Sequence, residues 1–249
     1  MKESVHLTVI PRLVSLDALR THCADCGMRE LCLPVGLSPT DVDALDAIVR
    51  KRVKVRKGEA LFRHGARFAS LYAVRVGSFK TTVVIDDGRE QIAGYHLPGD
   101  ILGLDGVGTD QHGSEAVALE NSEVCEIPFA QLESVAQRIP GLQHNLHRIL
   151  SREISTDHRL LLLLGSMRAE ERLAAFLLSL SERYARRGYS STDFVLRMTR
   201  DEIGRYVGLK LETVSRLFSR FAAEGFIKVR GRNVQIVDIA MLKQLISSR

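Results

Sequence analysis

The sequence predicts an α+β protein in which a β jelly roll is followed by a long helix and a winged helix-turn-helix. Three observations lead to this prediction. Short β-like runs separated by glycines fill residues 52–127. An apolar stripe with spacings of three and four residues then continues to about residue 164. The last third of the chain has two short helical patterns joined by Gly208 and followed by a hairpin pattern.

Length and composition suit one large domain or two modest ones. The chain has 249 residues, of which 45% are hydrophobic, enough for ordinary cores. The N-terminus has no apolar run of signal-peptide length, and the longest aliphatic stretch, Leu160 to Leu164, is far too short to span a bilayer. We therefore expect a cytoplasmic protein without a membrane partner.

Four cysteines form the most distinctive motif. Cys23, Cys26 and Cys32 have the spacing C-x2-C-x5-C, and Cys125 lies 93 residues after Cys32 in the strand-like run 123–127. Only a folded domain could bring Cys125 to the other three. Because cytosolic thiols are normally kept reduced, a four-thiolate metal or cluster site is favoured over structural disulfides, which stay a minor alternative.

Seven runs are predicted to be strands of the jelly roll. Their shortness and the turn residues between them favour an antiparallel barrel or double sheet over a βαβ sheet. The clearest hairpin turn is predicted at 86–88, where Asp-Gly tolerates positive φ. The runs are 52–55, 60–62, 70–76, 79–85, 91–97, 116–119 and 123–127.

A helix is predicted from about 129 to 164, with one stripe formed by Leu142, Leu146, Leu150, Ile154, Asp157, Leu161 and Leu164. Such a stripe suits either a helix that pairs with its own copy or an ordinary core helix. In a two-fold dimer Asp157 would face its symmetry mate, and the two carboxylates would repel each other. Asp157 could equally be a solvent-facing acid.

The C-terminal third is predicted to be helical and then to end in a hairpin. A helix over 166–187 stops at Gly188, and Thr199 to Glu202 form a capping box for a short helix that ends at Gly208. A second helix over about 210–224 is followed by strands at 226–229 and 234–237. This order is that of a winged helix-turn-helix.

Charge and residue type both point to nucleic acid as the partner of this module. Residues 166–249 carry 16 Lys and Arg against 9 Asp and Glu, which gives +7, whereas the rest of the chain carries 19 against 21, which gives −2. Glu212, Ser215 and Arg216 share one face of the second helix, and their side chains suit base edges. The alternative is an exposed Glu–Arg ion pair that stabilises the helix.

Together these elements resemble the Crp/Fnr superfamily of bacterial transcription regulators, whose jelly roll is of the cyclic-nucleotide-binding type. The resemblance covers nearly the whole chain. The cysteine motif at 23–32 with the remote Cys125, combined with the sequence Glu-Thr-Val-Ser-Arg at 212–216, resembles the FNR branch, the anaerobic regulators that include the Anr proteins.

The resemblance implies a [4Fe-4S] cluster on Cys23, Cys26, Cys32 and Cys125. It implies that this cluster favours a DNA-binding homodimer without oxygen, and that oxygen converts it towards a [2Fe-2S] form and separates the dimer. By the same resemblance the chain would read palindromic TTGAT-type sites in double-stranded DNA and touch RNA polymerase. The residues implied are Glu212, Ser215 and Arg216 for DNA, Ile154 and Asp157 for the dimer switch, and Ile85, Asp86 and Gly88 for the polymerase.

Three alternatives compete with this interpretation. A cyclic nucleotide is not expected, because His112-Gly113 stands where related proteins place an Arg-Ser pair on the phosphate. A structural zinc site usually has two C-x-x-C pairs, and this chain has one. An enzyme is not expected either, since the histidines are scattered and no phosphate-binding glycine loop or nucleophile elbow is present.

The predicted division of the chain has four parts. Residues 1–50 form a cluster-binding segment with a helix, and residues 51–135 form the jelly-roll sensor domain. Residues 136–165 form the dimerisation helix. The winged helix-turn-helix then occupies residues 166–249.

Overall fold

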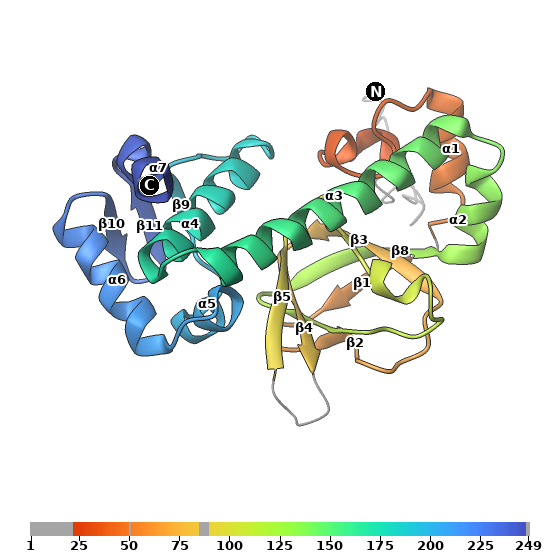
Figure 1. Ribbon diagram of the computed structural model, residues 1–249. Coiled ribbons are helices and arrows are strands. Elements are labelled where there is room, and N and C mark those ends of the chain that lie inside the picture. The colour runs from red at the N-terminus through yellow and green to blue at the C-terminus, as the bar shows by residue number, and fades with distance from the viewer. Residues whose placement is uncertain (1–21, 50, 85–89, 248–249) are drawn as a thin grey trace, which may run out of the picture.

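The structure is a computed structural model that describes residues 22–49, 51–84 and 90–247 (Figure 1). A long helix, α3 (Pro140–Ser166), extends diagonally along the molecule. Helices α1 (Pro39–Asp46) and α2 (Phe129–Ala136) lie at one end of it, and the C-terminal elements lie at the other. The jelly roll packs below α3 between these two ends.

The jelly roll consists of two antiparallel four-stranded sheets, ordered β1-β8-β3-β6 and β2-β7-β4-β5. Apolar side chains from both sheets fill the space between them, with Phe79, Val74 and Val124 almost fully buried. The predicted double sheet is therefore confirmed. The strands are β1 (Lys51–Val55), β2 (Ala60–Phe62), β3 (Ser70–Val76), β4 (Phe79–Val84), β5 (Glu90–His96), β6 (Ile101–Leu102), β7 (Glu115–Ala118) and β8 (Ser122–Pro128).

Each of the seven predicted strand runs corresponds to a strand, and the eighth strand, β6, was not predicted. Its two residues are too few to show an alternating pattern. The predicted hairpin turn at 86–88 lies outside the described residues. Strands β4 and β5 on either side of it pair antiparallel, with Val84 opposite Glu90.

The single helix predicted from 129 to 164 is wrong, because two helices occupy this stretch. Helix α2 ends at Ala136 and α3 begins at Pro140. Proline disfavours helical backbone in the residue before it and has no N–H to donate to a preceding turn. Ile139 accordingly has extended backbone, with φ −121° and ψ 92°.

Helix α3 has two apolar faces rather than one stripe. Leu142, Ile149 and Leu163 are buried against the rest of the chain, whereas Leu150, Ile154 and Leu161 are 38%, 56% and 67% exposed. Successive steps of four residues rotate the position by about 40° each, so the predicted stripe drifts from one face to the other. Among the described helices, none is both long and apolar enough to cross a lipid bilayer.

The C-terminal part contains the predicted helix-turn-helix and hairpin, with two additional elements. Strand β9 completes a sheet ordered β10-β11-β9, and α7 begins where Asp238 accepts from the Met241 N–H at 3.0 Å. The elements are α4 (Ala169–Ala185), β9 (Asp193–Val195), α5 (Arg200–Val207), α6 (Leu211–Ala223), β10 (Ile227–Arg230), β11 (Asn233–Ile236) and α7 (Ile239–Ser247).

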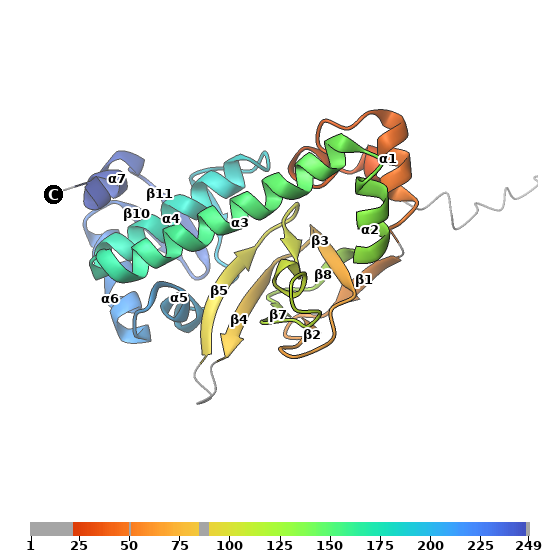
Figure 2. The same ribbon diagram turned by 45° about the vertical axis from the view of Figure 1, so that its right-hand side comes forward.

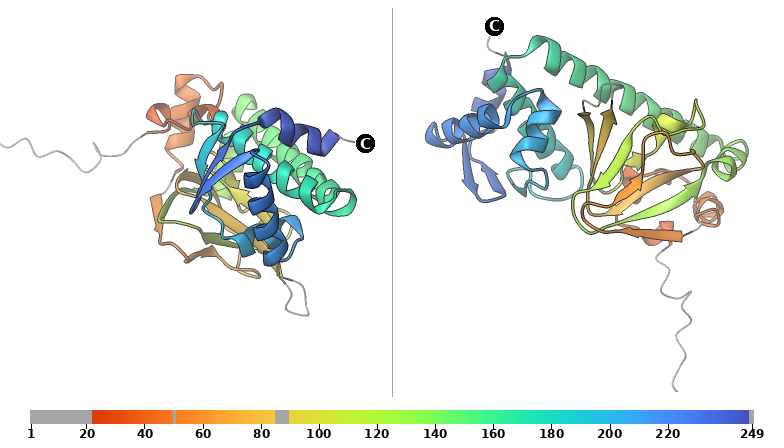
Figure 3. Two further views of the ribbon diagram at one scale, coloured as in Figure 1. Left: turned by 90° about the vertical axis from the view of Figure 1, so that its left-hand side faces the viewer. Right: turned by 90° about the horizontal axis from the view of Figure 1, so that it is seen from below.

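The two halves of the chain meet where β4 and β5 approach α5 (Figure 2). Lys80 Nζ lies 2.7 Å from Glu202 Oε1, and Arg205 Nη1 lies 2.9 Å from Glu90 Oε2. Seen from below, α3 passes over both halves (Figure 3).

The end of α3 belongs to the C-terminal core. Leu163 is part of that core, and Leu164 packs against it. Arg172 of α4 donates to Leu164 O at 2.7 Å and to Met167 O at 2.8 Å, and its other guanidinium nitrogen reaches Val207 O at 3.3 Å. One guanidinium thus joins the ends of α3 and α5.

Candidate cysteine site and nucleic-acid interface

The four cysteines line one pocket between the N-terminal segment and the jelly roll. Cys23, Cys26 and Cys32 come from the cysteine segment, which we define as residues 22–37, and Cys125 comes from β8. Apolar side chains, including Leu33, Leu45 and Ile127, complete the walls. All four are free thiols and partly buried. The structure therefore brings together the four residues that the sequence singled out.

Short turns give the cysteine segment its shape. It contains two 3₁₀ helices, η2 (Cys23–Asp25) and η3 (Arg29–Leu31). The Cys26 N–H donates to Cys23 O at 3.4 Å, and the Cys32 N–H donates to Arg29 O at 3.4 Å. Because a 3₁₀ helix has about three residues per turn, the C-x2-C spacing places two thiols on the same side.

Buried contacts with α3 hold the end of this segment in place. The Asn145 side-chain amide donates to Leu33 O and Val35 O, both at 2.8 Å. Leu33 is fully buried, and Leu37 packs so closely on Gly141 that a Cβ there would lie 3.0 Å from Leu37 Cδ2. Asn145 was not predicted as a site residue, although an amide within an apolar helix face is a signal that could have identified it.

A second anchor holds the start of the segment. Asp46, at the end of α1, accepts from the Cys23 N–H at 2.9 Å and lies 2.7 Å from His22 Nδ1. These hydrogen bonds outweigh partial burial and keep the pKa of Asp46 below its usual value. The start and the end of the cysteine segment are thus tied to different helices.

Burial makes the cysteine pocket unfavourable for uncompensated thiolates. It raises the pKa of Cys32 to about 12 and also raises the pKa of Cys23 and of Cys125. The neighbouring thiols contribute in the same direction. At Cys23, Cys32 and Cys125 a bound cation would favour the thiolate form, so the donor set fits a thiolate-ligated metal group. Among the described residues, no three His, Cys, Asp or Glu side chains converge as a single metal ion requires.

The helix-turn-helix is shaped by a capping box and two glycines. Thr199 Oγ1 accepts from the Glu202 N–H at 3.2 Å, and the Glu202 carboxylate accepts from the Thr199 N–H at 2.7 Å. Gly208 ends α5 with φ +67°, a conformation that favours glycine. A Cβ on Gly204 would lie 2.4 Å from Leu209 O, so the turn requires a glycine there as well.

The face of α6 opposite its core leaves the three predicted DNA-reading residues accessible. Val214, Phe218 and Phe221 are buried, whereas Glu212 and Arg216 are exposed and Ser215 is partly exposed. The nearby hairpin of β10 and β11 exposes three cations, Lys228, Arg230 and Arg232.

His112, which the resemblance aligns with a phosphate-binding arginine of related proteins, lies in a buried aromatic stack. It is 3% exposed, and its ring centroid lies 3.8 Å from the Phe62 ring centroid at an interplanar angle of 10°. Its Nδ1 lies 3.5 Å from the carboxylate of Asp105, which also accepts from Ser114.

The remaining predicted site residues fall in two groups. Ile154 and Asp157 lie on the exposed face of α3. Ile85, Asp86 and Gly88 lie outside the described residues.

Comparison with known proteins agrees with this geometry. A family described as "Cyclic nucleotide-binding domain" matches residues 52–139, and one described as "Crp-like helix-turn-helix domain" matches residues 171–245. The transcriptional regulatory protein Btr of Bordetella pertussis is 50% identical over 94% of this chain and 97% of its own length. The transcriptional activator protein Anr of Pseudomonas aeruginosa is 44% identical over 96% and 94%.

A solved structure supports the same relationship. The structure of FixK2 from Bradyrhizobium japonicum superimposes with a TM-score of 0.73 and 30% identity, covering 78% of this chain and 96% of that one. The Crp-like helix-turn-helix indicates DNA binding, and regulators of this kind are dimers rather than enzymes. The chain belongs to the Crp/Fnr family of transcription regulators.

Proposed function

We propose that this regulator senses oxygen through a [4Fe-4S] cluster held by Cys23, Cys26, Cys32 and Cys125. The observation that carries the proposal is the shared pocket of these four free thiols, three from the cysteine segment and one from the jelly roll. When bound, the cluster supplies the reaction with oxygen, which converts it towards a [2Fe-2S] form. We propose that the protein works in the cytoplasm.

The spacing of the cysteines favours a cluster over zinc. A structural zinc site usually has two C-x-x-C pairs, and this chain has one, formed by Cys23 and Cys26. Four thiolates are also the usual ligands of an iron–sulfur cluster.

The exposed face of α3 supports the proposed homodimer. Leu150, Ile154 and Leu161 expose apolar surface that a second copy would cover. Asp157 lies on the same face, so a two-fold pairing would bring two carboxylates close together. Since Asn145 of α3 also holds the cysteine segment, occupancy of the thiol pocket can shift the balance between this repulsion and apolar burial.

The resulting dimer would present two copies of α6 to successive major grooves. We propose that Glu212, Ser215 and Arg216 read TTGAT half-sites of a palindrome, with the cationic hairpin on the phosphates. The segment containing Ile85, Asp86 and Gly88 is proposed to contact RNA polymerase, so that the bound dimer activates or represses transcription. A cyclic-nucleotide effector is disfavoured by the buried His112–Asp105 pair.

An anaerobic preparation tests the proposal. About four irons and four acid-labile sulfides per chain are expected. Air should bleach the absorption spectrum and shift sedimentation from dimer to monomer, with loss of binding to a TTGAT palindrome. A zinc-loaded or metal-free protein that dimerises equally well in both atmospheres would refute it.

A further inference from the structure

The turn from Leu97 to Asp100, between β5 and β6, touches the cysteine segment directly. Gly99 has φ +91°, and a Cβ added to it would lie 2.8 Å from Leu31 Cβ. Leu31, which immediately precedes Cys32, therefore packs on the backbone of Gly99. Any displacement of the cysteine segment at this point changes a contact with the turn.

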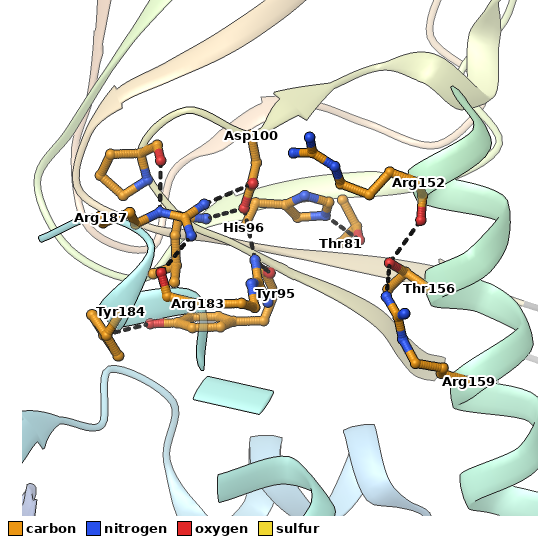
Figure 4. Close-up of polar contacts among 12 residues, drawn as sticks. Thr81, Tyr95, His96, Asp100, Arg152, Thr156, Arg159, Arg183, Tyr184 and Arg187 are labelled. Carbon is orange, nitrogen blue, oxygen red and sulfur yellow. Dashed lines mark hydrogen bonds and ion pairs between the residues drawn. The ribbon is translucent and has the colours of Figure 1, made fainter. Parts of the chain in front are cut away.

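The next residue, Asp100, binds two arginines, Arg183 in α4 and Arg187 just after its end (Figure 4). Its Oδ2 accepts from Arg183 Nη2 at 2.7 Å, and its Oδ1 accepts from Arg187 Nη2 at 2.7 Å. Arg187 also donates from Nε to Pro98 O at 2.7 Å, and Arg183 donates to Tyr95 O. Two guanidinium groups thus clamp the turn of the jelly roll to the C-terminal domain.

These ion pairs are partly buried, so their electrostatic attraction is stronger than that of surface ion pairs. The Arg187 side chain is 4% exposed and that of Asp100 is 21% exposed. Burial alone would raise the pKa of Asp100, but Arg183 and Arg187 hold it below its usual value. The Asp100 carboxylate also accepts from the Leu97 N–H at 2.8 Å, which fixes its direction. Neutralising Asp100 would leave two guanidiniums without their common partner.

The same turn is connected to Cys125 through the sheet. The Gly99 N–H donates to Val74 O at 2.8 Å, and the Val74 N–H donates to Asp100 O at 2.9 Å. Val74 lies on β3, where its neighbour Ala73 is paired with Cys125 of β8. The turn is therefore in contact with both walls of the thiol pocket, the segment and the sheet.

We propose that Asp100 is a positioning residue that transmits the placement of the cysteine segment to the DNA-binding domain of the same chain. The path runs from Leu31 through Gly99 and Asp100 to Arg183 and Arg187, at the end of α4 and just after it. It goes beyond the proposed function, because it needs neither a second copy nor a particular metal group. The clamped arrangement, in which the reading face of α6 is exposed, is the one proposed to bind DNA.

Two matched truncations in the cysteine segment test the path. Leu31→Ala keeps the Cβ beside Gly99 and removes the Cδ1 that also lies there, whereas Leu37→Ala removes the Cδ2 that contacts Gly141 of α3. Amide hydrogen exchange at residues 183–188 of the metal-free protein is the readout. Leu31→Ala should speed this exchange several-fold and Leu37→Ala should not. Equal effects of the two variants would overturn the proposal.

Combining Leu31→Ala with Asp100→Asn tests whether the effect passes through the carboxylate. Asp100→Asn alone should speed exchange at 183–188, and Leu31→Ala should add nothing further in that background. Asp100→Glu should restore part of the protection. A full additional effect of Leu31→Ala would overturn the path. If Asp100→Asn does not fold, Arg187→Lys is measured instead, with the same expected non-additivity.

DNA binding separates this inference from the proposed function. Anaerobically prepared Asp100→Asn should dimerise as the unmodified protein does but bind a TTGAT palindrome roughly 5- to 100-fold more weakly. Unchanged or tighter binding would overturn the inference and leave the cluster proposal intact. Absence of iron and sulfide from every preparation, together with non-additive exchange effects, would refute the cluster proposal and support the inference.

Discussion

Replacing Asn145 with alanine tests how the cysteine segment is held on α3. The substitution removes two hydrogen bonds of 2.8 Å and leaves Leu33 O and Val35 O without their donor. A buried acceptor without a partner costs about 1–3 kcal/mol. The hydrogen bond to Leu33 O is buried, whereas the one to Val35 O is only partly buried. Water can therefore replace part of the second hydrogen bond. The expected loss in unfolding free energy is therefore about 2–4 kcal/mol.

Urea denaturation of the metal-free protein measures this loss. With a slope of about 1–3 kcal/mol per molar urea, the midpoint should fall by roughly 1–2 M. His144→Ala is the control, because His144 is the exposed neighbour on the same helix and its loss should change stability by less than about 0.5 kcal/mol. Amide exchange in residues 22–37 should rise in Asn145→Ala alone. A change as small as that of the control would refute the reasoning.

Three further changes have defined outcomes. Burial, helped by the nearby carboxylate of Asp157, raises the pKa of Glu153 from 4.5 to about 7, so stability should fall as pH rises from 4.5 through 7. Glu153→Gln should abolish that fall and gain at most about 3 kcal/mol at pH 8, as thermal unfolding across this range would show. Gly204→Ala should lower the unfolding free energy by about 1–3 kcal/mol and abolish DNA binding, because the new Cβ would collide with Leu209 O. Gly165→Ala is the control and should not destabilise the protein, because no atom lies within 4 Å of the new Cβ. Asp157→Ala should tighten the metal-free dimer roughly tenfold by sedimentation, and no tightening would contradict the repulsion.

Local patterns were sufficient for most of the fold but not for the contacts between elements. The seven strand runs and the capping box at Thr199 follow from alternation and short-range hydrogen bonding, which the sequence displays directly. The break before Pro140 follows from the restricted backbone of the residue that precedes a proline, a local signal that the prediction of one helix did not use. Strands β6 and β9 have two and three residues and gain their structure from pairing with distant partners.

The cysteine pocket was predictable because thiols are few and have a distinctive spacing. The residues that hold the cysteine segment were not predictable, because Asn145 and Asp46 bind backbone groups, which any residue could provide. Asp100 was missed for a related reason. Its partners lie 83 and 87 residues away, in α4 and just after it, and arginines and aspartates are too common in the sequence to suggest a pairing.

Helix α3 contributes side chains to both hydrophobic cores, which limits where the chain can be cut into fragments. Leu142 and Ile149 belong to the core around the cysteine segment, whereas Leu163 belongs to the C-terminal core and Arg172 bonds to Leu164 O. A fragment beginning at residue 166 would lack Leu163 and Leu164 and would expose the part of the C-terminal core that they cover. A DNA-binding fragment should therefore begin at or before Leu160.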